Sequence, residues 1–260
     1  MKQQKIDLLK KGYTTIPSFL DKDFADLLKE SMYKSYDLCR SVQVKNGIDA
    51  ATDGTIHHSI ASEDTIYLDL IDRLCQSDIF NFIQDYFGGN YIINSYGGVI
   101  NLPLGRSYVT NMHRDIRFFS GEFPLMLNML VMLDDLTPDN GALYLLAGSH
   151  QTGDRPVVKD FFEKSDRAIG KKGDILFFNS NLWHAAGVNE TEQETMEITV
   201  TLTKPFMKQQ LDYSRAIGYD RVEKMSPELQ QLIGYFSRTP SNLEEWYQKP
   251  EQRFYRPGQD

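Results

Sequence analysis

Residues 171–191 of the chain read KKGDILFFNSNLWHAAGVNET. Gly173 and Asp174 are typical of a tight turn, and the four apolar residues at 175–178 are typical of a buried strand. His184 stands beyond this apolar run, near the far end of the stretch. We therefore expect a turn followed by a strand, with His184 placed where a β-rich run ends.

Five further short β-rich runs lie between residues 90 and 205. They are YIINSYGGVINL (91–102), SYVTNMH (107–113), LMLNMLVML (125–133), GALYLLA (141–147) and MEITVTLT (196–203). Turn signals rich in proline, glycine, asparagine and aspartate separate several of them. Short strands at this spacing favour a barrel or a sandwich over a parallel α/β sheet.

The segments on either side of these runs have helical patterns. The elements predicted there are a short helix, a strand at Tyr13–Ile16, an amphipathic helix capped by Asp21, a mobile loop over 43–60, helices over 62–74 and 77–87, and a polar helical segment after 206. The predicted fold class is therefore α+β, a jelly roll with N- and C-terminal helices. We expect one domain over residues 1–260, with the β core at approximately 90–205 and the helical cover at 1–89 and 206–260.

Composition limits the partners that the chain is expected to bind. The formal net charge of −8 argues against the basic face that nucleic-acid backbones require, and against attraction to anionic lipid. No run approaches the ~18 apolar residues of a membrane span, and the N-terminus has no signal-peptide pattern. Cys39 and Cys75 form no metal-binding pair and are expected to be reduced. These features predict a cytoplasmic protein without a nucleic-acid or membrane partner.

Two of the five histidines lie in contexts that suggest metal binding. His113-Arg114-Asp115 is an HxD triplet at the end of a β run, and His184 follows 71 residues later. In an extended strand residues i and i+2 point to the same face, so the imidazole and the carboxylate can reach one ion together. Two imidazoles and one carboxylate form the facial triad of non-haem Fe(II) oxygenases, which leaves positions open for O₂ and a co-substrate.

Three ordered segments resemble the phytanoyl-CoA dioxygenase family of Fe(II)/2-oxoglutarate oxygenases. NMHRDIRFF (111–119) carries the HxD, and LDDLTPDNGALYLLAGSH (133–150) carries the family's Asn-Gly-x-Leu and Gly-Ser-His elements. KKGDILFFNSNLWHAAGVNET supplies the Gly-Asp pair, the distal histidine and a following asparagine. The resemblance implies a double-stranded β-helix (cupin-like) core, with Fe(II), O₂ and 2-oxoglutarate. It also implies His113, Asp115 and His184 as the iron ligands, and a structural role for His150.

The segment after His184 departs from this family. Its members place an arginine about ten to fourteen residues later, where a planar guanidinium binds the distal carboxylate of 2-oxoglutarate in bidentate fashion. The corresponding stretch here contains no arginine, and Met196 or Glu197 stands in its place.

Three readings of this departure stay open. Another cation could bind 2-oxoglutarate: Arg117, Arg106 and Lys204 are the candidates, and strand parity with Asp115 favours Arg117. Alternatively, the protein is an iron oxygenase that does not use 2-oxoglutarate, or a non-catalytic binding protein on the same fold.

Further residues are expected around the co-substrate. Asn101, Thr110 and Asn128 lie on strands expected to line the cavity, where each could bind the C1 carboxylate of 2-oxoglutarate. Trp183 and the pair Phe118-Phe119 are candidates for an apolar wall that keeps water from the reacting atoms.

The reaction is predicted only as a class. Halogenating relatives replace the acid of the triad by a small residue, so Asp115 favours hydroxylation, with desaturation and cyclisation left open. Without a long basic stretch to bind the phosphates of coenzyme A, we expect a small amino-acid-like substrate or natural-product intermediate. The sequence does not predict an oligomeric state.

Overall fold

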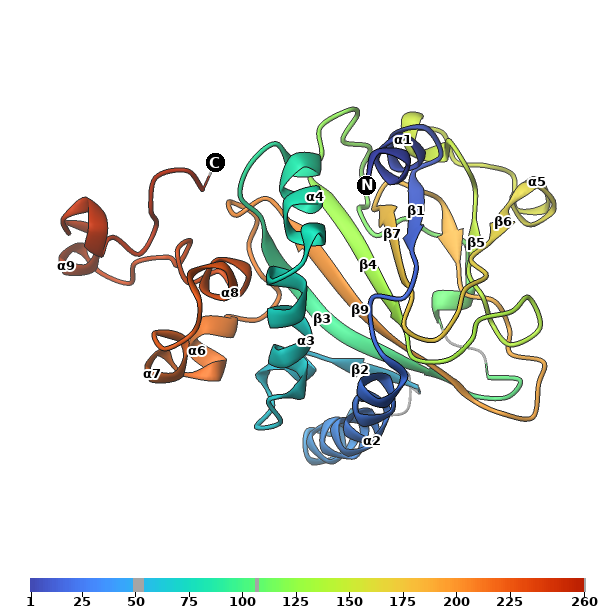
Figure 1. Cartoon of the computed structure of the whole chain (residues 1–260), viewed down its shortest axis with the longest axis horizontal. Helices are drawn as coiled ribbons and strands as arrows, with labels where there is room; N and C mark the ends of the chain where they lie inside the picture. Colours follow the sequence, from blue (N-terminus) through green and yellow to red (C-terminus); the bar gives the residue numbers. More distant parts are fainter. Residues whose placement is uncertain (49–53, 106–107, 260) are drawn as a thin grey trace. The chain divides into compact units, whose positions relative to one another are not determined.

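Helices and antiparallel strands build the structure, a computed structural model, which confirms the predicted α+β class (Figure 1). It describes residues 1–48, 54–105 and 108–259. The chain forms two compact units, residues 1–57 with 97–199 and residues 58–96 with 200–260. The organisation as one oxygenase domain stays a prediction.

The first unit contains most of the strands. Its helices and turns are α1 (Lys2–Lys10), α2 (Lys22–Lys45), η2 (Tyr108–Thr110), η3 (Ser149–Gln151) and α5 (Val158–Lys164). Its strands are β1 (Tyr13–Ile16), β2 (Thr55–His57), β4 (Met126–Met132), β5 (Tyr144–Leu145), β6 (Asp166–Arg167), β7 (Ile175–Asn179) and β8 (His184–Ala185). Strands β3 (Ile92–Asn101) and β9 (Thr195–Thr203) each continue from one unit into the other.

The strands form two sheets. The larger has the order β1-β7-β4-β9-β3-β2, and the smaller has the order β6-β5-β8. β4 and β7 are antiparallel, with Asn128 opposite Phe178, and β5 and β8 are antiparallel, with Leu145 opposite His184. Directly opposed residues point to the same face of a sheet, so these registers decide which side chains share a face.

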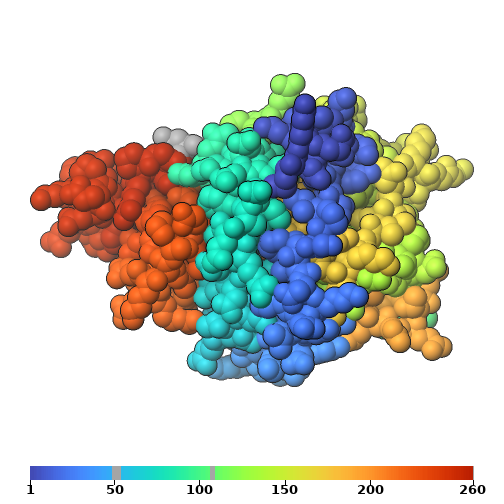
Figure 2. Space-filling view, viewed as in Figure 1, coloured from blue at the N-terminus to red at the C-terminus, as the bar shows by residue number. Residues whose placement is uncertain are grey.

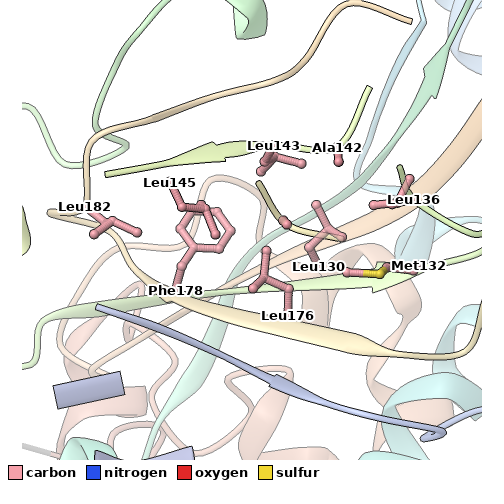
Figure 3. Close-up of a cluster of buried hydrophobic side chains, with 10 residues drawn as sticks. Leu130, Met132, Leu136, Ala142, Leu143, Leu145, Leu176, Phe178 and Leu182 are labelled. Carbon is pink, nitrogen blue, oxygen red and sulfur yellow. The ribbon is translucent and has the colours of Figure 1, made fainter. Parts of the chain in front are cut away.

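A hydrophobic core lies between the two sheets. It includes Leu130 of β4, Leu176 and Phe178 of β7, and Leu145 of β5 (Figure 3). Since side chains alternate along a strand, Asn128 lies on the same face of β4 as Leu130. This face is apolar at Leu130 and Met132, and Asn128 is its buried polar member.

The N-terminal elements follow the sequence prediction closely. β1 spans Tyr13–Ile16 as expected, and the side chain of Asp21 accepts a hydrogen bond from Phe24 N at 2.8 Å, which caps α2. α1 and the edge strand β1 lie at the surface of the first unit (Figure 2, blue).

The Gly-Asp pair at 173–174 fastens the start of β7 to the N-terminal segment. The carboxylate of Asp174 accepts hydrogen bonds from Ser18 N at 2.9 Å and from Lys171 N at 2.8 Å. Gly173 has a φ of +93°, and a Cβ there would lie 2.3 Å from the carbonyl oxygen of Leu20. Only glycine fits this position, which explains the turn that the sequence predicts.

Two sequence predictions about local structure are wrong. The mobile loop over 43–60 contains the end of α2 and the strand β2, whereas 49–53 lie outside the described residues. Over the described residues 108–113, the β run predicted at 107–113 is instead the 3₁₀ turn η2 followed by a single bridge at His113, and residue 107 lies outside the described residues. Pairing with distant strands explains both differences. β2 forms because it pairs with β3. His113 pairs with His184 of β8, and β8 has only two residues, too few to pair with a longer strand.

The second unit is largely helical. Its elements are η1 (Ser59–Ala61), α3 (Ile66–Cys75), α4 (Asp78–Phe87), α6 (Tyr213–Ile217), α7 (Tyr219–Val222), α8 (Pro227–Leu232), α9 (Leu243–Trp246) and η4 (Pro250–Gln252). α4 ends at Gly88, whose φ of +66° makes it the predicted C-terminal stop. Among the helices described, none combines the length and apolar character needed to cross a membrane.

Candidate metal centre

A backbone bridge brings His113 and His184 together. His113 N donates to His184 O at 2.9 Å, and His184 N donates to His113 O at 3.0 Å. Two residues opposed in this way direct their side chains to the same side. The imidazole ring centres are accordingly 4.2 Å apart, although the residues lie 71 positions apart in the chain.

Asp115 completes a cluster of three potential metal ligands. Its Oδ1 lies 3.8 Å from His113 Nε2, and its Oδ2 lies 3.6 Å from His184 Nε2. The three donor atoms all lie within 4.8 Å of one another. His184 is buried while His113 and Asp115 are partly accessible, so the cluster is open on one side.

Hydrogen bonds hold both imidazoles in the orientation that metal binding requires. Nδ1 of His113 lies 2.7 Å from the carbonyl oxygen of Asn111, and Nδ1 of His184 lies 3.0 Å from that of Leu182. A carbonyl only accepts, so each Nδ1 is the protonated nitrogen and each Nε2 keeps its lone pair toward Asp115. Burial lowers the pKa of His113, and His184 and Arg117 act in the same direction. The neutral form that binds metals is therefore favoured.

The carboxylate of Asp115 is oriented by Asn128. Asn128 Nδ2 donates to Asp115 Oδ2 at 2.5 Å, and it also lies 3.0 Å from Ser180 Oγ. The ring of Phe178, opposite Asn128 in the sheet, lies edge-on to His184 with centroids 4.8 Å apart. The donor set and its supports therefore fit one divalent metal ion, with an apolar wall on one side.

The sequence predicts an extended strand that directs His113 and Asp115 to the same face, and this prediction is wrong. Residues 115–118 form bends, so no strand continues through the HxD. Strand parity therefore no longer supports Arg117, which is exposed, although its charge does reach His113. Arg114 is buried, donates to the carbonyl oxygens of Ser149 and Thr152, and packs on Trp183. It is thus held by the loop carbonyls of Ser149 and Thr152.

The apolar wall differs from the one expected. Trp183 points away from the cluster: its Nε1 donates to Asp154 O at 2.9 Å and its ring lies 4.7 Å from the guanidinium of Arg114. Phe118 and Phe119 are exposed. Phe178 occupies the place against His184 instead, because alternation along β7 directs it inward.

The three polar residues predicted around the co-substrate have different positions. Asn128 touches the cluster directly. Asn101 Nδ2 lies 3.4 Å from Gly187 O, which links β3 to the segment after β8. Thr110 is not on a strand. With Tyr144 and Arg167 it lines a cavity of about 400 Å³ whose lining does not include the three cluster residues. Tyr144 is adjacent to the inward Leu145 in β5, so this cavity lies on the opposite face of the smaller sheet.

Two other candidate anchors for 2-oxoglutarate, Lys204 and Arg106, stay predictions. Lys204 belongs to the second unit, and Arg106 lies outside the described residues. At the positions where the resemblance predicts an arginine, both side chains are buried: Met196 is part of the core, and Glu197 is 4% exposed.

Some of these supporting residues could not be assigned a role from sequence. The carbonyl groups of Asn111 and Leu182 carry no residue-type signal, because every residue has one. Ser180 and Phe178 lie within the decisive stretch 171–191, but only the register of β7 with β4 shows that they face the cluster. His150 has the structural position that the resemblance implies, with Nε2 3.1 Å from Leu9 O.

This geometry defines a candidate centre for one divalent metal ion. The chain belongs to the phytanoyl-CoA dioxygenase (PhyH) family, whose sequence pattern matches residues 8–196. The resemblance seen in the three ordered segments is thereby confirmed.

The chain is also similar to individual proteins. An uncharacterized protein of Mycobacterium tuberculosis is 37% identical over 148 residues, which cover 56% of this chain and 54% of that protein. The chain thus spans about half the length of this relative. Dioxygenase cdmA of Talaromyces verruculosus is 26% identical over 257 residues, covering 90% of this chain and 83% of that protein. The iron/alpha-ketoglutarate-dependent dioxygenase penM of Penicillium thymicola is 27% identical over 139 residues, with coverages of 50% and 44%.

A solved structure shows the same fold. The crystal structure of AviO1 from Streptomyces viridochromogenes Tue57 has a TM-score of 0.58 and 18% sequence identity. The likeness covers 79% of this chain and 95% of that chain.

Proposed function

We propose that the protein is an Fe(II)-dependent oxygenase that uses O₂ and 2-oxoglutarate to hydroxylate a small-molecule substrate. His113, Asp115 and His184 are the proposed iron ligands, on a core that we propose to be a double-stranded β-helix. The catalytic roles of the three residues rest on the cluster geometry described above.

The observation that carries this proposal is that hydrogen bonds orient all three potential metal ligands. Each imidazole is fixed through Nδ1 by a backbone carbonyl, and Asp115 is fixed by Asn128. The lone pairs of these three groups therefore point toward one place, where they would repel one another unless a cation lies between them. Bound Fe(II) would supply the reactivity toward O₂ that amino-acid side chains lack.

The surrounding residues have separate tasks in this scheme. Asn128 keeps one carboxylate oxygen of Asp115 engaged, which leaves Oδ1 directed toward His113. Phe178 excludes water on one side of His184. The accessible side, at His113 and Asp115, is where the co-substrate and the substrate would enter.

The use of 2-oxoglutarate is supported by family membership and by the name of the relative penM. Arg117 is the proposed anchor of its distal carboxylate. It is exposed beside the HxD, and its positive charge reaches His113. Asn101 and Asn128 are proposed to bind polar atoms of the co-substrate. Thr110 lines the outer cavity, so it would contact only a molecule that extends there.

One observation favours a second candidate, an iron oxygenase that does not use 2-oxoglutarate. Met196 or Glu197 stands where the resemblance predicts an arginine, and both side chains are buried. An ionised carboxyl there would repel the distal carboxylate of 2-oxoglutarate. In this version the substrate itself would bind the iron.

Metal analysis and an anaerobic titration test these alternatives. Purified protein reconstituted with Fe(II) under nitrogen should hold one iron per chain. Addition of 2-oxoglutarate should then produce a weak visible charge-transfer band and a binding heat. Iron without the band and without heat would leave only the second candidate. If the protein holds no stoichiometric iron, both candidates fail in favour of a non-catalytic binding protein.

A further inference from the structure

Glu197 on β9 is a buried acid, and among the described residues no cation acts on its carboxyl group. It is 4% exposed, and its Oε1 accepts no hydrogen bond from the described residues. Buried carboxyl groups are normally paired or hydrogen-bonded, because an unpaired one is costly to bury. The unpaired Oε1 therefore requires an explanation that the contacts of the described residues do not supply.

The glycines of β3 show which face of the larger sheet carries Glu197. A Cβ on Gly98 would lie 2.6 Å from Met32 Cε of α2, so Gly98 faces that helix. A Cβ on Gly97 would point the opposite way and lie 3.6 Å from Thr199 Oγ1. Glu197 is two residues before Thr199 in the same strand and therefore also faces away from α2.

The face of Glu197 is the one turned toward the smaller sheet. Asn101, four residues after Gly97, reaches Gly187 O in the segment after β8. Leu133 N donates to Met196 O at 3.0 Å, which places Glu197 beside the end of β4. Asn128, which holds Asp115, lies four to five residues away along β4, on the order of 15 Å. A small molecule that reaches toward Glu197 from the cluster would therefore be an extended one.

Over the part of the chain that the structure describes, no neighbouring charge neutralises this carboxyl. The charged group that acts on it is Asp134, whose Oδ1 is already paired with Lys29 Nζ of α2 at 2.7 Å. Burial, and secondly Asp134, raises the pKa of Glu197 to about 8. A ligand bearing a positive charge and N–H donors would pair with the free Oε1 and neutralise the carboxyl.

We propose that Glu197 binds the protonated amine of the substrate, so that the substrate is an extended, amine-bearing small molecule. The proposal rests on the proposed function, in that the reacting end of this molecule lies at the metal cluster. The chain's net charge of −8 also favours the approach of a cation over that of an anion.

Binding of a matched pair of probes tests this proposal. Iron-loaded protein under nitrogen is titrated calorimetrically with n-pentylammonium and with 1-pentanol at pH 7. The amine should bind at least about tenfold more tightly than the alcohol. Since the pKa of Glu197 is about 8, binding should also release close to one proton per chain, measured in buffers of different ionisation enthalpy.

Two variants assign the effect to Glu197. Glu197→Gln keeps the shape of the side chain and should abolish both the preference for the amine and the proton release. Glu192→Gln, an exposed control in the loop before β9, should change neither. Equal affinity of the wild-type protein for the two probes, or an undiminished preference in Glu197→Gln, would overturn the proposal.

A wild-type measurement keeps the proposal testable if Glu197→Gln fails to fold. Carboxyl carbons labelled with ¹³C should show a glutamate that titrates near pH 8 and whose pKa falls by at least one unit in the presence of n-pentylammonium; an unchanged titration contradicts the proposal. Failure here is distinguishable from failure of the oxygenase function, because iron stoichiometry is measured on the same sample.

Discussion

Replacement of Asn128 by alanine should weaken iron binding without removing any iron ligand. The Asn128 side chain, 6% exposed, donates to Asp115 at 2.5 Å and lies 3.0 Å from Ser180 Oγ. A hydrogen bond to a charged group contributes about 1.5–3 kcal/mol, and loss of such a support typically lowers metal affinity roughly 10- to 100-fold. We therefore expect the dissociation constant for Fe(II) to rise by about this factor, equivalent to about 1.4–2.7 kcal/mol.

The assay is competition with a fluorescent Fe(II) chelator under nitrogen, and Asn181→Ala is the matched control. Asn181 is 2% exposed and exchanges hydrogen bonds with Ser120, but it does not touch the cluster. Both variants should lose thermal stability without iron, since each loses buried hydrogen bonds. The reasoning is refuted if Asn128→Ala binds Fe(II) as tightly as the wild-type protein, or if Asn181→Ala loses as much affinity.

Three further perturbations test other parts of the site. His184→Ala removes one proposed ligand, so iron content should fall steeply while circular dichroism stays unchanged; iron-dependent turnover in this variant would show that the third ligand is misassigned. Arg117→Ala should raise the KM for 2-oxoglutarate about 30-fold, for a lost charge pair of about 2 kcal/mol, whereas Arg114→Ala should mainly lower the melting temperature. Glu197 binds a proton between pH 4.5 and about 8 that the unfolded chain releases, so wild-type stability should fall as pH rises through this window. Glu197→Gln should remove that fall, which is worth about 4 kcal/mol. The free energy of unfolding of both proteins is measured by denaturant titration at pH 5 and at pH 8. An equal change between the two pH values in both proteins would contradict the burial argument.

Sequence predicted those parts of the fold that depend on local chemistry. The turn at Gly173 and the following strand are as expected, because the positive φ and the apolar run are local requirements. The helix capped by Asp21 is as expected for the same reason. The cluster of His113, Asp115 and His184 was also predicted, but from motif order and a strand that does not exist.

Features that depend on pairing between distant segments were out of reach. The bridge between His113 and His184 is a single antiparallel pair, and no local pattern signals it. In β9 the sequence alternates apolar and polar residues, a pattern that usually places the polar face in solvent. Here the face of Glu197 turns toward the smaller sheet instead, so the burial of that carboxyl could be recognised only in three dimensions.

The bridge between His113 and His184 allows the opening of the site to be measured directly. The amide hydrogens of these two residues are each held by the other's carbonyl oxygen, so neither can exchange with solvent unless the two segments separate. Separation would also part the two imidazoles. Deuterium exchange at these two amides therefore reports the opening of the metal centre itself, and it can be followed in the protein with or without iron and without a substrate.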